Sequence, residues 1–373
     1  MRNSKKFGCV LLCALSFLVS VALLGNMIGC KAPENSAPAL RAPAGGILIK
    51  GAGATLPSLL YKHWFASYNN IHHDTVIGYD IVGSGEGIRR FIGNNVKEED
   101  RVDFGASDAA MRDEEMAQVP KGVVLVPATA ASVVLAYNLP GFEGDLKLSR
   151  RAYAGIFSGQ IRKWNDPIIA ASNSGKRLPN MDITTVVRQD RSGTTYAFTK
   201  HLDAISEAWR SQHGAATLVN WPGNAMRATG NEGVAGRIQH AIGSIGYVGY
   251  EFAHSLGLKL AMLENRDGKF VAPTARSFTS SFADVKMPEN MRLFIPDPAG
   301  SDSYPIVTFS WILLYTSYDD PAKSKAIHDL FRWCLVEGQE SAPQLGYVQL
   351  PEAVAKKALA ALDTITASEA GKK

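Results

Sequence analysis

Gly51-Ala52-Gly53-Ala54-Thr55-Leu56-Pro57 joins a strand-like apolar run, Gly46-Ile47-Leu48-Ile49, to a stretch of helical apolar spacing that begins at Leu59. A strand that turns sharply into a helix directs unpaired backbone N–H groups and the positive end of the helix dipole at one point. Such a turn is a candidate anion site, although the same residues also suit an ordinary tight connection. One turn alone does not decide between the two.

Three further segments share this character: Gly83-Ser84-Gly85-Glu86-Gly87, Phe104-Gly105-Ala106-Ser107-Asp108 and Arg188-Gln189-Asp190-Arg191-Ser192-Gly193-Thr194. The glycines of the first have the wrong spacing for a dinucleotide fingerprint. Ligands of α/β sheets bind at the carboxyl ends of strands, where all these turns are expected. Four such turns together predict one shared cage for a small tetrahedral anion.

Two charged side chains refine this prediction. Arg188 offers a planar guanidinium suited to two oxygens of an oxyanion, and Asp190 is placed to hold that guanidinium. Asp108 should repel an anion unless the ligand carries a proton, because an ionised carboxylate only accepts hydrogen bonds. Phosphate carries a proton at neutral pH and sulfate does not, so Asp108 favours phosphate. The alternatives are a surface ion pair for Arg188 and a helix cap for Asp108.

Strand and helix patterns alternate along the chain, which predicts α/β domains with largely parallel sheets. The β-branched runs at 123–126 and 132–137 predict two buried strands, and 306–315 predicts another. Helical spacing is expected at 87–94 and 322–336. Cys334 lies in the second of these helices, which favours a buried core residue over a nucleophile.

The composition is that of a globular protein. The 373 residues are 46% hydrophobic and 20% charged, and the formal net charge is +4. Three positive charges lie within the first six residues, so the rest of the chain is nearly neutral. This balance gives no support for a nucleic-acid partner.

The N-terminus has the pattern of a targeting segment. Basic residues precede an apolar stretch from Phe7 to Ile28, which ends at Met27-Ile28-Gly29-Cys30. A transmembrane anchor is one interpretation. The position of Cys30 instead resembles a bacterial lipobox, with a lipoprotein signal peptide at 1–29 and lipid on Cys30. Residues 30–44, rich in Ala and Pro, predict a flexible tether to the membrane.

The turn residues as a set resemble the PstS family, the periplasmic phosphate-binding proteins of high-affinity phosphate ABC transporters. The stretches that carry the resemblance are Gly51-Ala52-Gly53-Ala54-Thr55-Leu56-Pro57, Val102-Asp103-Phe104-Gly105-Ala106-Ser107-Asp108-Ala109 and Ser192-Gly193-Thr194-Thr195. Softer similarity continues through Ile161-Arg162-Lys163-Trp164-Asn165-Asp166, Ile245-Gly246-Tyr247-Val248 and Tyr304-Pro305-Ile306.

The resemblance implies a type II solute-binding fold, with two α/β lobes joined by crossing strands and a ligand cleft between them. Lobe 1 would be residues 45–130 plus 295–373, and lobe 2 residues 131–294. It implies phosphate import with an ABC permease, no catalysis, no cofactor or metal, a periplasmic or cell-surface location and a monomer. The phosphate ligands it implies are Thr55, Leu56, Ser84, Asp108, Arg188, Ser192, Gly193 and Thr194, with Asp190 supporting Arg188.

Three residues depart from the family pattern. Leu56 replaces a common phenylalanine, but its expected role uses only the backbone N–H. Glu86 and Arg191 stand where many members have glycine. A carboxylate pointing inward at Glu86 would weaken phosphate binding, so we expect it to face solvent, with Arg191 partly offsetting its charge.

Other functions stay open at this point. One is a receptor for another oxyanion such as sulfate or molybdate, with Asp108 as the discriminating residue. Another is a surface lipoprotein that senses phosphate. An anchored phosphate-ester hydrolase is less favoured, because the sequence has no Gly-x-Ser-x-Gly motif and no evident metal cluster.

Overall fold

The computed structural model describes residues 40–367. The predicted signal peptide, Cys30 and most of the predicted tether lie outside the described residues. The described residues form one compact unit. Within the described part, no helix is both long and apolar enough to cross a membrane.

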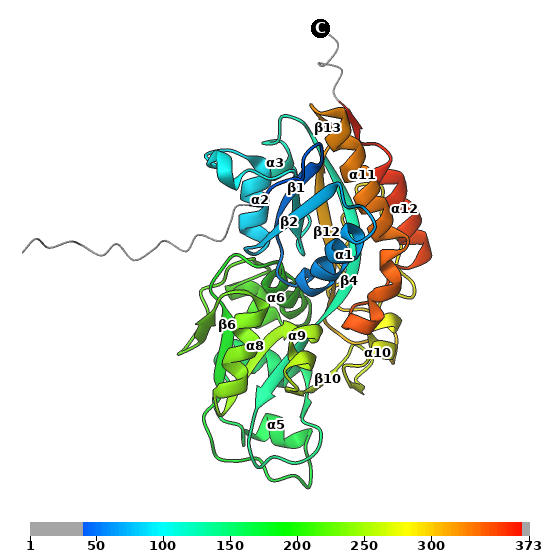
Figure 1. Cartoon of the computed structure of the whole chain (residues 1–373). Coiled ribbons are helices and arrows are strands. Elements are labelled where there is room, and N and C mark those ends of the chain that lie inside the picture. Colours follow the sequence, from blue (N-terminus) through cyan, green and yellow to red (C-terminus); the bar gives the residue numbers. More distant parts are fainter. Residues whose placement is uncertain (1–39, 368–373) are drawn as a thin grey trace, which may run out of the picture. The chain divides into compact units, whose positions relative to one another are not determined.

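One large sheet organises the unit (Figure 1). Its strands are β1 (Ile47–Gly53), β2 (Thr75–Ile81), β3 (Phe104–Ser107), β4 (Val123–Asn138), β6 (Thr184–Arg188), β7 (Met226–Ala228), β8 (Ser244–Gly249), β9 (Lys259–Leu260) and β12 (Val307–Tyr315). Their order is β2-β1-β3-β12-β4-β8-β6-β7, and β9 also pairs with β4. Two small sheets hold β5 (Lys147–Leu148) with β10 (Met262–Glu264) and β11 (Phe270–Val271), and β13 (Ser317–Tyr318) with β14 (Thr366–Ala367).

The prediction of a largely parallel sheet is only partly right. The flanking strands pair in parallel, β1 with β2 and β3 on one side and β6 with β7 and β8 on the other. The centre is antiparallel, because β12 pairs with β3 and β4, and β4 pairs with β8, in opposite directions. Alternating β and α patterns identify the flanks but do not reveal the direction of the two central strands.

β4 corrects a second prediction, since the two strands expected at 123–126 and 132–137 are one continuous strand. Its first part pairs with β12 and its last part with β8, so it belongs to both halves of the sheet (Figure 1). Pro127 interrupts the sequence pattern but not the strand. It lies where the register with β12 shifts between Ser310 and Trp311, and a bulge tolerates a residue without an N–H.

Helices flank this sheet. They are α1 (Ser58–Asn69), α2 (Ser84–Ile92), α3 (Asp113–Met116), α4 (Arg150–Phe157), α5 (Pro167–Ala171), α6 (Gly193–Ile205), α7 (Glu207–Gln212), α8 (Gly230–His240), α9 (Tyr250–Ser255), α10 (Ala275–Ser280), α11 (Pro321–Leu335) and α12 (Glu352–Leu362). α2 begins three residues before its predicted start, so Ser84 belongs to its first turn. Cys334 is a buried free cysteine in α11, as predicted.

The strand directions bring four turns together. β1, β2 and β3 are parallel, so their carboxyl ends lie at one edge. β4 runs in the same direction as β3 and continues past that edge, and β8 and β6 run back against its far end. The carboxyl end of β6, at Arg188, therefore faces the carboxyl ends of β1, β2 and β3 near the middle of β4.

Candidate anion site

The four turns predicted from the sequence meet in space. The backbone N–H of Asp108 donates to Ser84 Oγ at 3.2 Å. A Cβ on Gly193 would come within 2.6 Å of both the Asp108 Cβ and Ser84 Oγ, so α6 approaches these two residues directly. A side chain at position 193 would push the start of α6 away from Asp108 and Ser84. We call the set Thr55, Leu56, Ser84, Asp108, Arg188, Ser192, Gly193 and Thr194 the cage; their contact with phosphate stays a prediction.

Arg188 ends β6 with its side chain buried, and Asp190 holds it from one side. Nε donates to Asp190 Oδ1 at 2.8 Å, and Nη2 pairs with Oδ2. Nη1 is also buried and finds no partner among the described residues. Burial raises the pKa of Asp190, but the Arg188 guanidinium and the Gly230 N–H outweigh it and lower that pKa below its usual value. A fixed, buried cationic nitrogen is thus left for a ligand.

The start of α6 supplies backbone donors. Ser192 is its N-cap, and its Oγ accepts from the Thr195 N–H at 3.1 Å. The N–H groups of Gly193 and Thr194 belong to the first turn, which has no intrahelical acceptors for them. Tyr247 ties this turn to Arg188, since its hydroxyl accepts from the Arg188 N–H at 3.1 Å and lies 2.7 Å from Thr195 Oγ1. The helix start and the cation are therefore held in one fixed relation.

Asp108 follows β3 and is 1% exposed. Burial raises its pKa to about 7, while hydrogen bonds from Ser310 and Thr194 and the charge of Arg188 act to lower it. Ser310 Oγ donates to Oδ1 at 2.9 Å. In its ionised form the Asp108 carboxylate can also accept a hydrogen bond from a proton-bearing ligand atom.

Ser310 was not predicted from the sequence. It lies in the middle of β12, about two hundred residues after Asp108 along the chain, and nothing in its local sequence distinguishes it from other strand residues. Only the antiparallel pairing of β12 with β3 and β4 brings it beneath Asp108.

Asn231, in the first turn of α8, was also missed. Its Nδ2 donates to Thr55 Oγ1 at 2.8 Å and to Thr194 Oγ1 at 3.1 Å, and so connects two of the predicted turns. Its Oδ1 accepts from the Gly249 N–H at 2.9 Å. The sequence signal was a Thr229-Gly230-Asn231 turn before a helix, similar to the four turns that were recognised.

Glu86 does not point its charge at the cage. Its carboxylate pairs with Arg89 at 2.7 Å and Arg90 at 3.0 Å, and a third of its side chain is exposed. The hydrogen bond from Arg89, together with Arg90 and against some burial, lowers the pKa of Glu86 to about 2. Arg89 and Arg90 thus balance its charge, whereas the sequence suggested Arg191.

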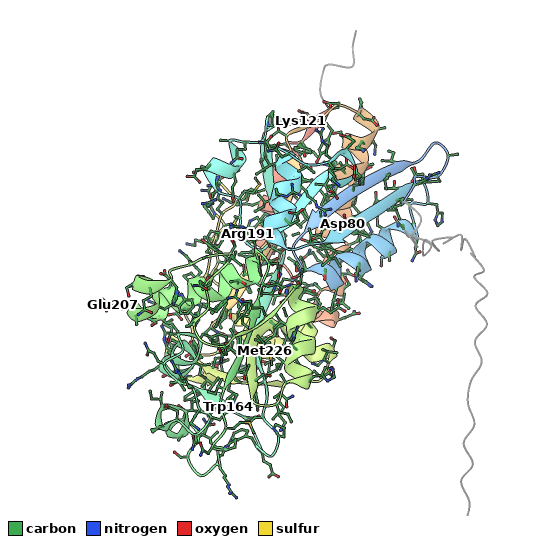
Figure 2. The ribbon with its side chains drawn as sticks, turned by 90° about the vertical axis from the view of Figure 1, so that its left-hand side faces the viewer. Asp80, Lys121, Trp164, Arg191, Glu207 and Met226 are labelled. Atoms are coloured by element: carbon green, nitrogen blue, oxygen red, sulfur yellow. The ribbon has the colours of Figure 1, made fainter. Side chains whose placement is uncertain are left out.

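Arg191 has a different place. Its carbonyl accepts from the Gly85 N–H at 3.0 Å, and its side chain covers Gly85, where an added Cβ would lie 2.4 Å from the Arg191 Cβ. Figure 2 shows it where the cyan segment with α2 meets the green segment with α6. Arg191 therefore packs the two turns against each other.

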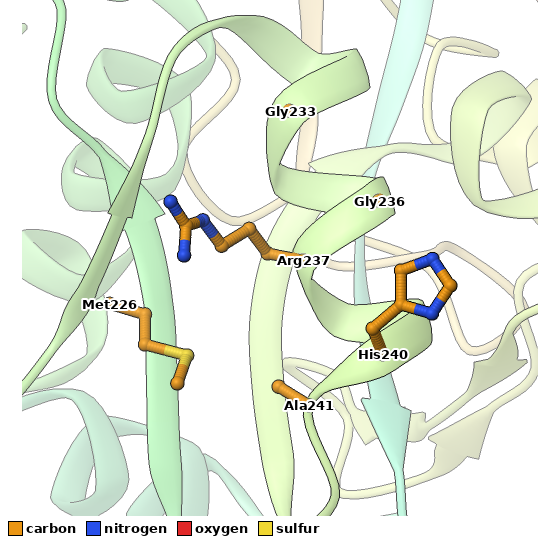
Figure 3. A pocket seen from close by; sticks show the side chains of 6 residues that line it. All are labelled: Met226, Gly233, Gly236, Arg237, His240 and Ala241. Atoms are coloured by element: carbon orange, nitrogen blue, oxygen red, sulfur yellow. The ribbon is translucent and has the colours of Figure 1, made fainter. Parts of the chain in front are cut away.

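The cavity in Figure 3 lies elsewhere. It has a volume of about 540 Å³ and is lined by Met226, Gly233, Gly236, Arg237, His240 and Ala241. No cage residue lines it. Among the described residues, no group of three or more His, Cys, Asp or Glu side chains is arranged to hold a metal ion.

Comparison with known proteins identifies the family. Residues 32–335 match the model of the PBP superfamily domain. The chain is 37% identical over 327 residues to the phosphate-binding protein PstS of Pasteurella multocida, covering 87% of this chain and 92% of that protein. It is 33% identical to the PstS of Methanocaldococcus jannaschii, over 95% of this chain and 94% of the relative.

Solved structures agree on the fold. A high-affinity periplasmic phosphate-binding protein (PfluDING) bound with phosphate superposes with a TM-score of 0.70, at 23% identity, over 84% of this chain and 93% of that one. A phosphate-binding protein from Stenotrophomonas maltophilia gives 0.69 at 21% identity over 84% and 93%. The predicted type II periplasmic-binding-protein fold is confirmed, and the chain belongs to the PstS family of phosphate-binding proteins.

Proposed function

We propose that this protein binds inorganic phosphate in the cage and delivers it to an ABC-type permease for import. The observation that carries the proposal is the buried Arg188 Nη1, which has no partner among the described residues and belongs to a guanidinium that Asp190 holds in place. A buried, unpaired cationic nitrogen is costly unless an anion completes it. We take this anion to be phosphate because the relatives are named phosphate-binding proteins.

The cage chemistry supports phosphate over other oxyanions. Arg188 and the N–H groups of Gly193 and Thr194 donate to bare phosphate oxygens. The ionised carboxylate of Asp108 accepts from the protonated oxygen, which sulfate lacks. A receptor for sulfate or molybdate is not favoured, since relatives over most of the chain are phosphate-binding proteins.

We infer further that the unit closes on its ligand as two lobes, residues 45–130 plus 295–373 and residues 131–294. β4 runs through both halves of the sheet, since its first part pairs with β12 and its last part with β8, which supports a hinge at this strand. Small-angle scattering with and without phosphate tests it. A smaller radius of gyration with phosphate is expected, and an unchanged scattering curve would contradict lobe closure.

The location follows from the N-terminal sequence. We propose that the protein lies on the periplasmic or cell-surface side, held by lipid on Cys30 after removal of residues 1–29. Mass spectrometry of the mature N-terminus checks this, and Cys30→Ser should release the protein from the membrane fraction. Retention of the variant would refute the lipid anchor.

The protein is proposed to act as a monomeric receptor with no catalytic activity. Light scattering gives the oligomeric state, and a dimer at micromolar concentration would refute the monomer. Calorimetry with phosphate, arsenate, sulfate and molybdate tests the ligand, and release of phosphate from an ester would point to a hydrolase instead. The proposed receptor binds phosphate and arsenate without turnover.

A further inference from the structure

Asn231 is completely buried at the start of α8 and contacts two cage residues without being one of them. Its backbone N–H and its Nδ2 both reach Thr55 Oγ1, at 3.3 and 2.8 Å. The same Nδ2 reaches Thr194 Oγ1 at 3.1 Å. One amide group thus contacts a hydroxyl from each of two turns that are far apart in the sequence.

The orientation of this amide is fixed by its other end. The Gly249 N–H lies 2.9 Å from Oδ1, and a backbone N–H can only donate. The atom that faces Gly249 must therefore be the oxygen, and the NH₂ group must face the two threonines.

This orientation determines what the hydroxyls do. A threonine hydroxyl has one proton to donate and two lone pairs that accept. Thr55 Oγ1 accepts both Asn231 N–H groups, so its proton is left to donate. The described residues provide no acceptor in hydrogen-bonding position for it. Thr194 Oγ1 also accepts from Asn231, and its proton is directed to the side on which Asp108 lies.

We propose that Asn231 is a positioning residue, which occupies both lone pairs of Thr55 Oγ1 and thereby turns this hydroxyl into a donor toward the bound anion, while its contact with Thr194 leaves the proton of that hydroxyl to Asp108. This proposal rests on the proposed phosphate-binding function. Fixing the hydroxyl matters for binding because bare phosphate oxygens can only accept hydrogen bonds. A hydroxyl that is free to rotate would present a lone pair to these oxygens part of the time.

Phosphate calorimetry on Asn231→Asp and Asn231→Ala tests the role. Asn231→Asp has the same shape and can still accept from Gly249, but it replaces the NH₂ with an acceptor that draws the Thr55 hydroxyl proton away from the ligand. We expect its phosphate affinity to fall by a factor of about 100 or more, and that of Asn231→Ala by about 10, which are typical effects of mismatched and missing buried hydrogen bonds. Wild-type affinity in the Ala variant, or in a folded Asp variant, would overturn the proposal.

A second measurement separates positioning from general support of the fold. If Asn231 acts through the hydroxyl, Asn231→Ala should cost less affinity in a Thr55→Val background than in the wild type, and as much as in the wild type in a Thr55→Ser background. Equal losses in the Val and wild-type backgrounds would refute the role. No phosphate binding by the wild type would instead refute the proposed function itself.

Asn265 offers the matched control. It is equally buried, and its amide donates to the carbonyls of Gly300, Ser301 and Ser303, none of which belongs to the cage. Asn265→Ala should lower the melting temperature and leave phosphate affinity unchanged. An equal loss of phosphate affinity in this control would show that removing any buried asparagine weakens binding to the same extent. That result would overturn the specific role of Asn231.

Discussion

Asp190 holds two of the three guanidinium nitrogens of Arg188 and leaves the third, Nη1, buried and without a protein partner among the described residues. The carboxylate fixes the plane of the cation, and the two N–H groups of the free nitrogen then donate in that fixed plane. This pairing explains how a cation can be buried before a ligand arrives.

Replacing Arg188 tests the anion contact. Arg188→Ala removes the buried donor and leaves Asp190 unpaired, so phosphate affinity should fall by about 2–5 kcal/mol in calorimetry. Arg150→Ala is the control, because Arg150 makes a similar two-point pair with Asp297, at 3.0 and 2.9 Å, outside the cage. An unchanged affinity in Arg188→Ala would remove Arg188 from the site.

Replacing Asp108 tests the selectivity. In Asp108→Asn the side chain can donate, so the repulsion of an unprotonated anion is lost. Sulfate should then compete with phosphate at concentrations where it does not compete in the wild type. Identical sulfate competition in the two proteins would show that Asp108 does not detect the ligand proton.

Asp108 also predicts how the stability of the ligand-free protein depends on pH. Its pKa in the folded state, about 7, lies above its ordinary value of 3.8 because of burial, so folding favours the protonated form. The stability it contributes is present at acid pH and is lost as the pH rises through about 7. Asp108→Asn should therefore raise the melting temperature more at about pH 8 than at about pH 4.

The exposed Asp182→Asn variant is the control for this pH series, since its side chain is 83% exposed. Its melting temperature should follow the wild type at every pH. A constant difference between Asp108→Asn and the wild type across the series would mean that Asp108 does not titrate differently on folding.

Replacing Ser310 changes the pKa of the Asp108 carboxyl without removing the carboxyl. Ser310→Ala removes the hydrogen bond that lowers the pKa of Asp108, so that pKa should rise further. The ratio of the variant's phosphate affinity to that of the wild type cancels the ligand's own titration. This ratio should decrease as the pH falls from about 9 to about 6, and a ratio independent of pH would contradict the link.

Glu86 should be almost neutral for binding. Its charge is paired with Arg89 and Arg90, so Glu86→Gln should change phosphate affinity by no more than about twofold at moderate salt. A tenfold gain in calorimetry would show that its charge does reach the cage.

Local sequence patterns were enough to find the four turns, because each needs small or hydroxyl residues between a strand and a helix. They also identified Arg188 with its partner Asp190, and Asp108, as the charged residues of the predicted site, and located most strands and helices. Ser310 and Asn231 could not be found in this way. Ser310 depends on strand pairing, which leaves no mark in its neighbouring residues. Asn231 does lie in a Thr229-Gly230-Asn231 turn before a helix, but the local pattern does not reveal its contact with two distant turns.

The two errors in the strands have the same origin. Pro127 lies between the two predicted runs, and β4 continues through it where the register with β12 shifts between Ser310 and Trp311. Whether β12 runs parallel or antiparallel to its neighbours depends on the two strands between which it inserts. The hydrophobic pattern alone does not encode this choice.

The central claim is that the cage recognises an oxyanion that carries a proton. Calorimetry of the wild-type protein with phosphate and with sulfate at about pH 8 tests it most directly, because both are then mainly dianions and only phosphate has a proton to donate. We expect tight binding of phosphate and at least about a thousandfold weaker binding of sulfate. Equal affinities for the two anions would contradict the account.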